Sequence, residues 1–305
     1  MSTPPQTRID ECVDFLYNAH TTRSPCFLGD ILDMPFAKDL TYSEAYEIQR
    51  RLSSRQSTCL GPVVGYKVGA TTPGMQRHLH VTHPMPGAMH ASRVIACDQG
   101  AATSGTSNAS TIPLALSRSS FNGPSVECEV LVQLGDTPLD ARGHLPGSNA
   151  PQLSLEEVLA SLDAVWTSAE LVDDRYGGDV AGEDNWKRQG MQPIMVADSF
   201  FHWASLRSAI SVPASKFRVE DFPHLVGHVE LNGVRVQSGP GSDVMGNPLE
   251  SVKFMAEFLA RERGEVLPAR TWISTGSVTM PVLPRAGDSV RVWFEGLPGE
   301  ARITY

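Results

Sequence analysis

Apolar residues recur at helical spacing through the first sixty residues of the chain. A run from Ile9 to Ala19 repeats them every three or four positions, which predicts an amphipathic helix. Thr41 and Glu44 have the spacing of a capping box and stand just before "AYEIQRRLSSRQ". The apolar positions after this box would share one face of a second helix: Ala45, Ile48 and Leu52.

Alternating patterns and turn residues predict β-structure farther along the chain. "VVGYKVGA" at 63–70 is typical of a short strand, and "HVELNGVRVQSG" at 228–239 predicts a hairpin that turns at Asn232-Gly233. From residue 271 to the C-terminus, glycine and proline divide several further short strands.

The remaining segments complete the predicted order of elements. We expect a helix over 155–165 after Ser154, a strand in "AELVDDRYGG" at 169–178, and a helix after Asn247-Pro248. Residues 98–124 predict long loops around one short strand, and 177–192 predict a loop or lid. The core stripe of the helix after Pro248 would be formed by Leu249, Val252, Met255 and Leu259. Helices in front and strands behind, with no repeat or linker, indicate an α+β fold.

Two carboxylates interrupt a strand that otherwise looks buried, "SVECEVLVQL" at 125–134. Side chains alternate along a strand, so Glu127 and Glu129 point to one face and Cys128 to the other. Like charges on one face repel, and burying an unpaired carboxylate is costly. A divalent cation with oxygen ligands would resolve both problems. The alternative is an exposed edge strand with a solvated acidic face.

Composition and charge narrow the class of protein. The 305 residues carry a net charge of −9 and are 41% hydrophobic, which describes an ordinary globular protein and argues against a nucleic-acid binder. The chain has no apolar run of about 18 residues and no signal-peptide pattern at its start. Five cysteines without CxxC spacing are typical of free thiols. These features predict a cytoplasmic protein that does not contact membranes.

Seven segments, taken in order, resemble a known family. The chain is similar to the hydratase/decarboxylase branch of the fumarylacetoacetate hydrolase superfamily, typified by 2-keto-4-pentenoate hydratase and 4-oxalocrotonate decarboxylase. The matching segments are "AYEIQ" (45–49), "GYKVGATTPGMQ" (65–76), "VECEV" (126–130), "AELVDDR" (169–175), "MGNPLESV" (245–252), "STGSVT" (274–279) and "AGDSVRVWFEGL" (286–297). No single segment is decisive, but their shared order makes a chance match improbable.

The resemblance implies a fold, a cofactor and a substrate class. The family fold is α+β, a curled mixed β-sheet core with flanking helices, here a single domain over 1–305 with a helical region at about 1–60 and a β-rich catalytic core at about 61–305. The family also implies a homo-oligomer and a Mg²⁺ or Mn²⁺ site, which would be held by Glu127, Glu129 and Glu170. Its substrates are small 2-oxo acids, decarboxylated or hydrated through an enolate that the metal stabilises.

Further site residues follow from the same match. Lys67 would donate to the developing enolate oxygen or to the substrate carboxylate, and the alternative is a surface lysine on an edge strand. Gly276, Ser277 and Thr279 would bind a substrate carboxylate, and the alternative is an ordinary polar turn. Asp173 and Arg175 would either orient the ligand Glu170 or form a structural salt bridge, and we favour the salt bridge.

The chain departs from the family pattern at three places. Thr82 and Met85 replace the two acidic residues of a V-D-Q-P-D-F-G type loop, and Phe201 stands where a water-handling serine is expected in "ADSFF" (197–201). Ala70 replaces a bulkier residue. Hydration needs a group that activates water, so these losses weaken hydration more than decarboxylation. His83 would substitute as an acid or base, or be a loop histidine without a role.

Two competing functions stay open from the sequence. The first is a C–C bond hydrolase of an acylpyruvate-like 1,3-dicarbonyl. That chemistry usually needs a His–Glu pair near the metal, and no such pair stands out in the N-terminal region. The second is a non-catalytic family member that acts as a binding subunit. The intact glutamates and Lys67 argue against it, whereas the lost acidic and serine positions argue for it.

Overall fold

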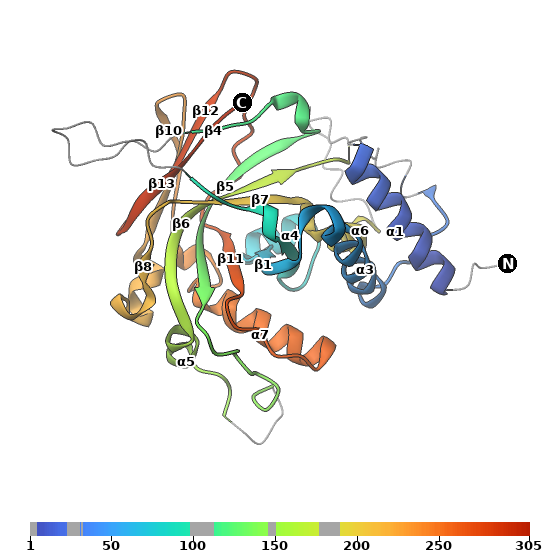
Figure 1. Cartoon of the computed structure of the whole chain (residues 1–305), viewed down its shortest axis with the longest axis horizontal. Helices are drawn as coiled ribbons and strands as arrows, with labels where there is room; N and C mark the ends of the chain where they lie inside the picture. The colour runs from blue at the N-terminus through green and yellow to red at the C-terminus, as the bar shows by residue number, and fades with distance from the viewer. Residues whose placement is uncertain (1–4, 23–30, 32, 98–112, 146–150, 177–189) are drawn as a thin grey trace.

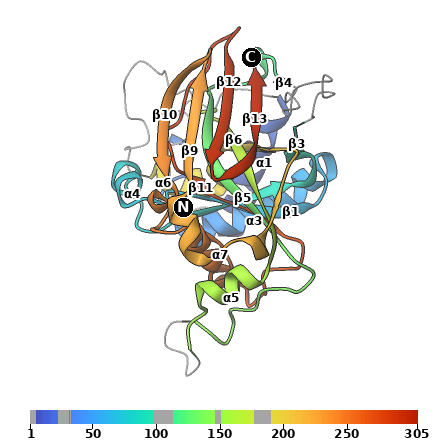
Figure 2. The same cartoon turned by 90° about the vertical axis from the view of Figure 1, so that its left-hand side faces the viewer.

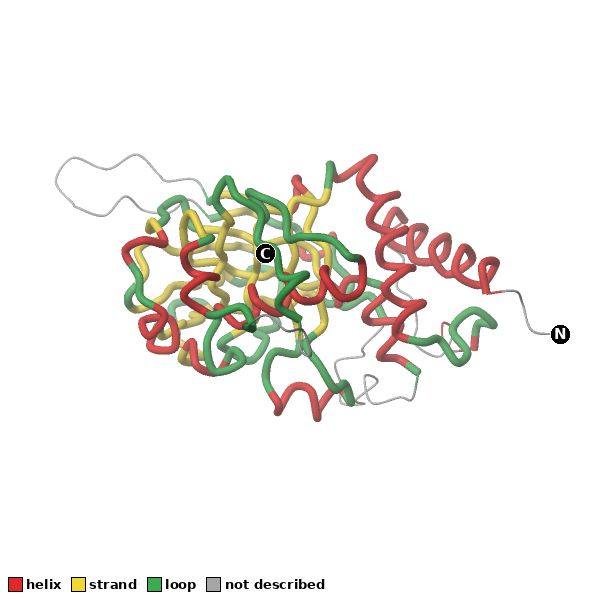
Figure 3. Tube along the Cα trace, turned by 90° about the horizontal axis from the view of Figure 1, so that it is seen from below, coloured by secondary structure: helices red, strands yellow, loops and turns green. Residues whose placement is uncertain are grey.

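The computed structural model describes residues 5–22, 31, 33–97, 113–145, 151–176 and 190–305. Strands dominate the middle of the molecule, and a group of helices gathers at one end (Figures 1 and 3). The α+β class is therefore confirmed, with a mixed β-sheet core and flanking helices. In the structure this β-sheet core consists of two open sheets, one of eight strands and one of five.

The larger sheet has the strand order β2-β1-β11-β5-β6-β7-β3, and β8 pairs with β6 beside this path. Its β1–β11 and β3–β7 pairs are parallel, and its other pairs are antiparallel. The bounds are β1 Val63–Gly69, β2 Met85–His90, β3 Val94–Ala96, β5 Pro124–Leu134, β6 Leu162–Asp173, β7 His202–Arg207, β8 Val212–Pro213 and β11 Trp272–Ser277.

The smaller sheet has the order β10-β9-β12-β13-β4, and four of its strands lie side by side in Figure 2. Its bounds are β4 Leu114–Ala115, β9 Val226–Leu231, β10 Val234–Pro240, β12 Ser289–Glu295 and β13 Leu297–Thr304. β9 and β10 form the predicted hairpin, with Asn232 and Gly233 at positive φ. The short strand expected between 98 and 124 is β4, while residues 98–112 lie outside the described residues.

The main core lies between the two sheets and under α7, Leu249–Arg263. Apolar residues of β5 fill it, including Val126, Cys128 and Val130, together with Val229 of β9 and Val292 of β12. The opposite face of β5 is thus left for Glu127 and Glu129, as the alternation predicted. The predicted core stripe of α7 is confirmed, because all four of its residues are fully buried.

A second apolar cluster holds the helical end together. It joins α1 (Pro5–Thr22), α3 (Tyr42–Leu60) and α6 (Met191–Ala197). Both predicted front helices are confirmed, and Thr41 with Glu44 forms the predicted capping box of α3. The same cluster takes in Leu79 of α4, Pro73–Leu79.

The helix predicted over 155–165 is shorter than expected. α5 spans Leu155–Ala160 after the Ser154 cap, and β6 begins at Leu162. "LDAVWTSAE" pairs along its length with β5, and this pairing outweighs the local pattern that favoured a longer helix. Most of the predicted lid, 177–189, lies outside the described residues, and Met191 already belongs to α6. No helix in the described part of the chain has the length and apolar character to cross a membrane.

Candidate metal centre

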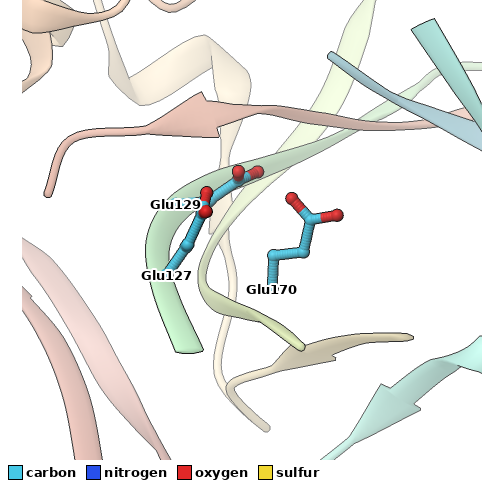
Figure 4. A group of neighbouring side chains, drawn as sticks. All are labelled: Glu127, Glu129 and Glu170. Atoms are coloured by element: carbon cyan, nitrogen blue, oxygen red, sulfur yellow. The ribbon is translucent and has the colours of Figure 1, made fainter. Parts of the chain in front are cut away.

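Two neighbouring antiparallel strands bring the three predicted metal ligands together. In the register of β5 and β6, Glu127 lies directly opposite Glu170, and Glu129 lies opposite Ser168. One carboxylate oxygen from each glutamate lies within 4.8 Å of the others, and Figure 4 shows the three side chains converging. Like charges directly opposite each other destabilise a sheet. The arrangement therefore needs positive charge nearby.

The exposed-edge alternative for this strand is wrong. β5 lies inside the larger sheet, between β11 and β6. Glu129 is 1% exposed and Glu170 is fully buried, whereas Glu127 is partly exposed. The acidic face of β5 is thus not a solvated surface.

Burial and mutual repulsion set the protonation of the three carboxyls. Burial, reinforced by repulsion from Glu170, raises the pKa of Glu127 to about 7. Burial, with repulsion from Glu170 and Glu127, raises the pKa of Glu129 well above its usual range. Burial alone would raise the pKa of Glu170 too, but Lys67 and a His202 hydrogen bond lower it to about 2. The described residues alone therefore do not supply enough positive charge to ionise all three carboxyls.

Lys67 supplies the positive charge that is present. Its Nζ lies 3.2 Å from Oε1 of Glu170, and its side chain is 3% exposed. Burial would lower the pKa of Lys67, but attraction to the three glutamates, foremost Glu170, raises it. β1 pairs with strands on both sides, so Lys67 is not the surface lysine of an edge strand.

The curl of the larger sheet makes this ion pair possible. β11 and β5 separate β1 from β6 in the strand order, yet Lys67 reaches Glu170. The hydroxyls of Ser205 on β7 and Ser274 on β11 approach to 3.5 Å across the same two inner strands, β5 and β6. Only a strongly curled sheet brings such strands together on one face, as the family resemblance implied.

Other side chains and one backbone group hold two of the glutamates in place. Ser274 Oγ donates to Oε2 of Glu129 at 2.5 Å, and the backbone N–H of Gly276 donates to the same oxygen at 3.2 Å. His202 Nδ1 lies 2.8 Å from Oε1 of Glu170. Burial lowers the pKa of His202, so its neutral ring donates from Nδ1.

Gly276 requires the absence of a side chain. Its φ is +107°, and a Cβ atom there would lie 2.5 Å from Cγ2 of Thr71. Glycine is the residue that adopts this conformation without strain. The turn it makes aims its N–H at Glu129. Gly276 was predicted to bind substrate, but in the structure its N–H bonds this glutamate.

The donor set fits a hard divalent cation. Oε2 of Glu170 is buried and makes no hydrogen bond among the described residues, which is costly unless a further partner is present. Three carboxylates supply only oxygen donors, the ligands that Mg²⁺ and Mn²⁺ prefer. A cation would also relieve the repulsion between Glu127 and Glu170.

A pocket of about 910 Å³ opens beside these residues. Lys67 and Glu127 line its inner end, and the predicted residues Ser277 and Thr279 line it as well. The Ser277 hydroxyl is already bonded to the carbonyl oxygen of Thr279 at 2.8 Å. Their role in substrate binding stays a prediction.

His83 lies elsewhere. Its Nε2 is 3.2 Å from the hydroxyl of Tyr46 and its ring packs edge-on against Tyr42. It is not among the described residues that line the pocket. The structure thus does not bring His83 to the carboxylates, and an acid or base role for it gains no support.

Phe200 and Phe201 occupy the region where a serine was expected. Both line the pocket, and Nζ of Lys67 lies 4.9 Å from the centroid of the Phe200 ring. Gly69 permits this approach, because a Cβ there would lie 2.5 Å from Cδ1 of Phe200. The hydroxyl oxygen of Ser199 instead accepts a hydrogen bond from the backbone N–H of Ala88.

Arg175 pairs with a partner that the sequence did not suggest. Its guanidinium forms a buried ion pair with Asp198, which also accepts a hydrogen bond from the hydroxyl of Tyr176 at 2.7 Å. Asp173 instead accepts from the backbone N–H groups of Asn122 and Gly123. The expected structural role of Arg175 therefore holds, although its partner differs.

Comparison with known proteins identifies relatives along most of the chain. No family model matches the sequence. The chain is 29% identical to a 4-oxalocrotonate decarboxylase of Pseudomonas putida over 259 residues, 85% of this chain and 84% of the relative. It is 27% identical to a 2-keto-4-pentenoate hydratase of Paraburkholderia xenovorans over 304 residues, 99% and 96% of the two chains.

Solved structures share the fold. A 4-oxalocrotonate decarboxylase from Pseudomonas putida G7, complexed with magnesium and adipate, has a TM-score of 0.77 at 24% identity and matches 100% of this chain and 99% of its own. A fumarylpyruvate hydrolase from Pseudomonas aeruginosa, in complex with Mn²⁺ and pyruvate, has a TM-score of 0.54 at 16% identity, over 80% and 89%. Sequence and fold together confirm the resemblance seen in the motifs: the chain is similar to the hydratase/decarboxylase branch of the fumarylacetoacetate hydrolase superfamily along most of its length, and it shares that fold.

Proposed function

We propose that the protein is a divalent-metal-dependent lyase that acts on a 2-oxo acid by decarboxylation or hydration, with Mg²⁺ or Mn²⁺ as cofactor. The observation that carries the proposal is the convergence of Glu127, Glu129 and Glu170 next to a large pocket, which Glu127 lines. The named relatives are decarboxylases and hydratases, which supports the same class. The family resemblance also implies a homo-oligomer, which light scattering would test.

Each glutamate has a defined task in this proposal. Glu127, Glu129 and Glu170 would hold the cation, and His202 and Ser274 fix the oxygens of two of them. The cation, when bound, would act as a Lewis acid toward the keto oxygen and the carboxylate of the substrate. The buried setting strengthens every electrostatic contact made there, because little water screens the charges.

Lys67 is placed to assist the charge that develops during the reaction. Its ammonium is buried, ionised and lines the pocket beside the glutamates. Removing a proton or breaking a bond next to the keto group moves electron density onto the keto oxygen. A fixed N–H donor aimed at that oxygen stabilises the transition state more than the ground state.

Calorimetric titration of the protein with Mg²⁺ and Mn²⁺, with and without oxalate, tests the proposed site. Oxalate imitates the planar enolate of a 2-oxo acid, so it should bind only together with the metal and should tighten metal binding. A panel of 2-oxo acids is then assayed with the metal for CO₂ release and for loss of ultraviolet absorbance. Absence of binding by both metals would refute the proposal.

Substitution Lys67→Met separates catalysis from metal binding. We expect kcat/KM to fall by about a hundredfold or more, the usual cost of losing one donor to a developing oxyanion. Mg²⁺ binding should persist because the three glutamates remain. Lys216→Met, at an exposed position, is the control and should leave both unchanged. Unchanged kcat/KM in Lys67→Met would remove this lysine from the mechanism.

A further inference from the structure

A turn of three residues, Ser199 to Phe201, brings an aromatic ring onto Lys67. The φ values of these residues are 51°, 53° and 65°, so three consecutive non-glycine residues lie in the left-handed region. Such residues seldom adopt this conformation, and a run of them persists only where the surrounding structure holds it. The backbone N–H of Phe201 donates to the carbonyl oxygen of Asp198 at 3.1 Å and closes the turn. The backbone from which the middle residue, Phe200, projects is thus tightly constrained.

Buried polar contacts hold both ends of this turn. Before it, Asp198 forms the buried ion pair with Arg175 and accepts a hydrogen bond from the hydroxyl of Tyr176 at 2.7 Å. After it, Nδ1 of His202 lies 2.8 Å from Oε1 of Glu170. Contacts of this kind are stronger inside a protein than at its surface, because little water screens them. The turn is therefore held between a buried ion pair and one of the candidate metal ligands.

Two glycines leave the space into which the turn and Lys67 fit. A Cβ atom at Gly69 would lie 2.5 Å from Cδ1 of Phe200 and 3.1 Å from Nζ of Lys67. A Cβ atom at Gly87, which pairs with Lys67 across β1 and β2, would lie 2.5 Å from the carbonyl oxygen of Ser199. In the space that both glycines leave, Nζ of Lys67 lies 4.9 Å from the centroid of the Phe200 ring. That separation is within the range of a cation–π interaction.

This contact differs in kind from the other attraction on the ammonium. Nζ of Lys67 also lies 3.2 Å from Oε1 of Glu170, but a divalent cation held by that carboxylate would share its charge and repel the ammonium. An aromatic face attracts a cation through its quadrupole, and a neutral ring keeps this attraction when a second cation binds nearby. The ring also helps to keep water from the lysine, whose side chain is 3% exposed.

From these contacts we infer that Phe200 is a positioning residue for Lys67, whose ammonium its ring holds in place when the glutamates carry a cation. The inference rests on the proposed function, in which Lys67 donates to the keto oxygen of the substrate. The ring acts through the lysine: it confines a flexible side chain to one place, so that less entropy is lost when the N–H meets that oxygen. An aliphatic side chain of similar size would fill the same space without this attraction.

A double-mutant cycle with oxalate as the probe tests the inference. Phe200→Leu and Phe200→Met remove the aromatic face but keep an apolar side chain, whereas Phe200→Tyr keeps the face. In Mg²⁺-loaded protein we expect the first two to bind oxalate roughly three- to thirtyfold less tightly than the wild type, and Phe200→Tyr to bind it within about twofold. In the Lys67→Met background, Phe200→Leu should cause no further loss. Calorimetry measures each affinity, for oxalate and for Mg²⁺ alone.

The outcomes separate the inference from the proposed function. Failure of oxalate to bind the Mg²⁺-loaded wild type would refute the proposed function, and the inference with it. Oxalate binding by the wild type with no loss in Phe200→Leu and Phe200→Met would overturn the inference alone. An equal loss from Phe200→Leu with and without Lys67 would also overturn it, because the ring would then act on the pocket and not on the lysine. Loss of Mg²⁺ binding in Phe200→Leu would overturn it too, since the turn would then support Glu170 through His202.

Discussion

Glu127→Gln should abolish metal binding while leaving the fold intact. The substitution removes one of three ionised ligands, so we expect Mg²⁺ to bind more than about a hundredfold less tightly. Turnover should fall by about three orders of magnitude or more, because a Lewis acid contributes several kcal/mol to such a reaction. Calorimetry and steady-state kinetics at saturating Mg²⁺ measure the two losses.

Without metal, the same substitution should leave the stability of the fold unchanged or raise it. Glu127 lies opposite Glu170, and their repulsion raises the pKa of Glu127 to about 7. The neutral amide removes that repulsion, so Glu127→Gln without metal should melt at the same temperature as the wild type or higher. Glu156→Gln, at an exposed position in the first turn of α5, is the matched control for both measurements. A variant that binds Mg²⁺ normally would show that Glu127 is not a ligand.

Arg175→Met should be among the most destabilising single substitutions in the protein. Arg175 and Asp198 are both buried, and Asp198 also contacts His20 and Tyr176. Removing the guanidinium leaves a buried carboxylate without its main counter-charge, which costs about 3–5 kcal/mol. Urea unfolding followed by circular dichroism measures the change in the free energy of unfolding.

The pH dependence of the loss in unfolding free energy tests whether the unpaired Asp198 carboxylate causes it. Burial would raise the pKa of Asp198, but attraction to Arg175 and then His20 lowers it to about 2. A carboxyl whose pKa is lowered on folding stabilises the protein above its unfolded pKa, and that stability is lost as the pH falls toward the folded pKa. The gap between wild type and Arg175→Met should therefore be full at pH 6 and narrow between about pH 4 and pH 2.

An exposed ion pair provides the matched control for this substitution. Arg142 pairs with Asp140 at 2.8 Å, and both side chains are about half exposed. Arg142→Met should cost no more than about 1 kcal/mol, since solvent screens the pair. An equal loss in the two variants would mean that methionine itself, rather than the buried charge, is responsible.

Local patterns in the sequence predicted two of the three glutamates of the candidate site. Alternation along "SVECEVL" placed Glu127 and Glu129 together, and the structure shows them on one face of β5. The third glutamate is different in kind. Its position depends on the pairing of β5 with β6, and register across strands is not visible in either strand alone. Only the family resemblance supplied Glu170.

The groups that support the glutamates were missed for the same physical reason. His202 reaches Glu170 from β7, and Ser274 reaches Glu129 from β11, so both contacts depend on tertiary structure. The alternation of side chains along "STGSVT" could have suggested which face of its strand Ser274 occupies. His202 carried no such signal, because it follows a three-residue turn whose backbone the sequence did not indicate. Arg175 was assigned to Asp173, its neighbour in sequence, whereas its true partner is 23 residues away.

The ion pair between Lys67 and Glu170 also affects the charge of the cation that the site prefers. With all three glutamates ionised, the ammonium cancels one negative charge and leaves two. A divalent ion restores neutrality, whereas sodium or potassium would leave a buried negative charge and a lanthanide would leave a positive one. The lysine thus helps the site to select a divalent ion over the monovalent cations of the surrounding solution. This selection depends on charge alone and is independent of ion size and coordination geometry.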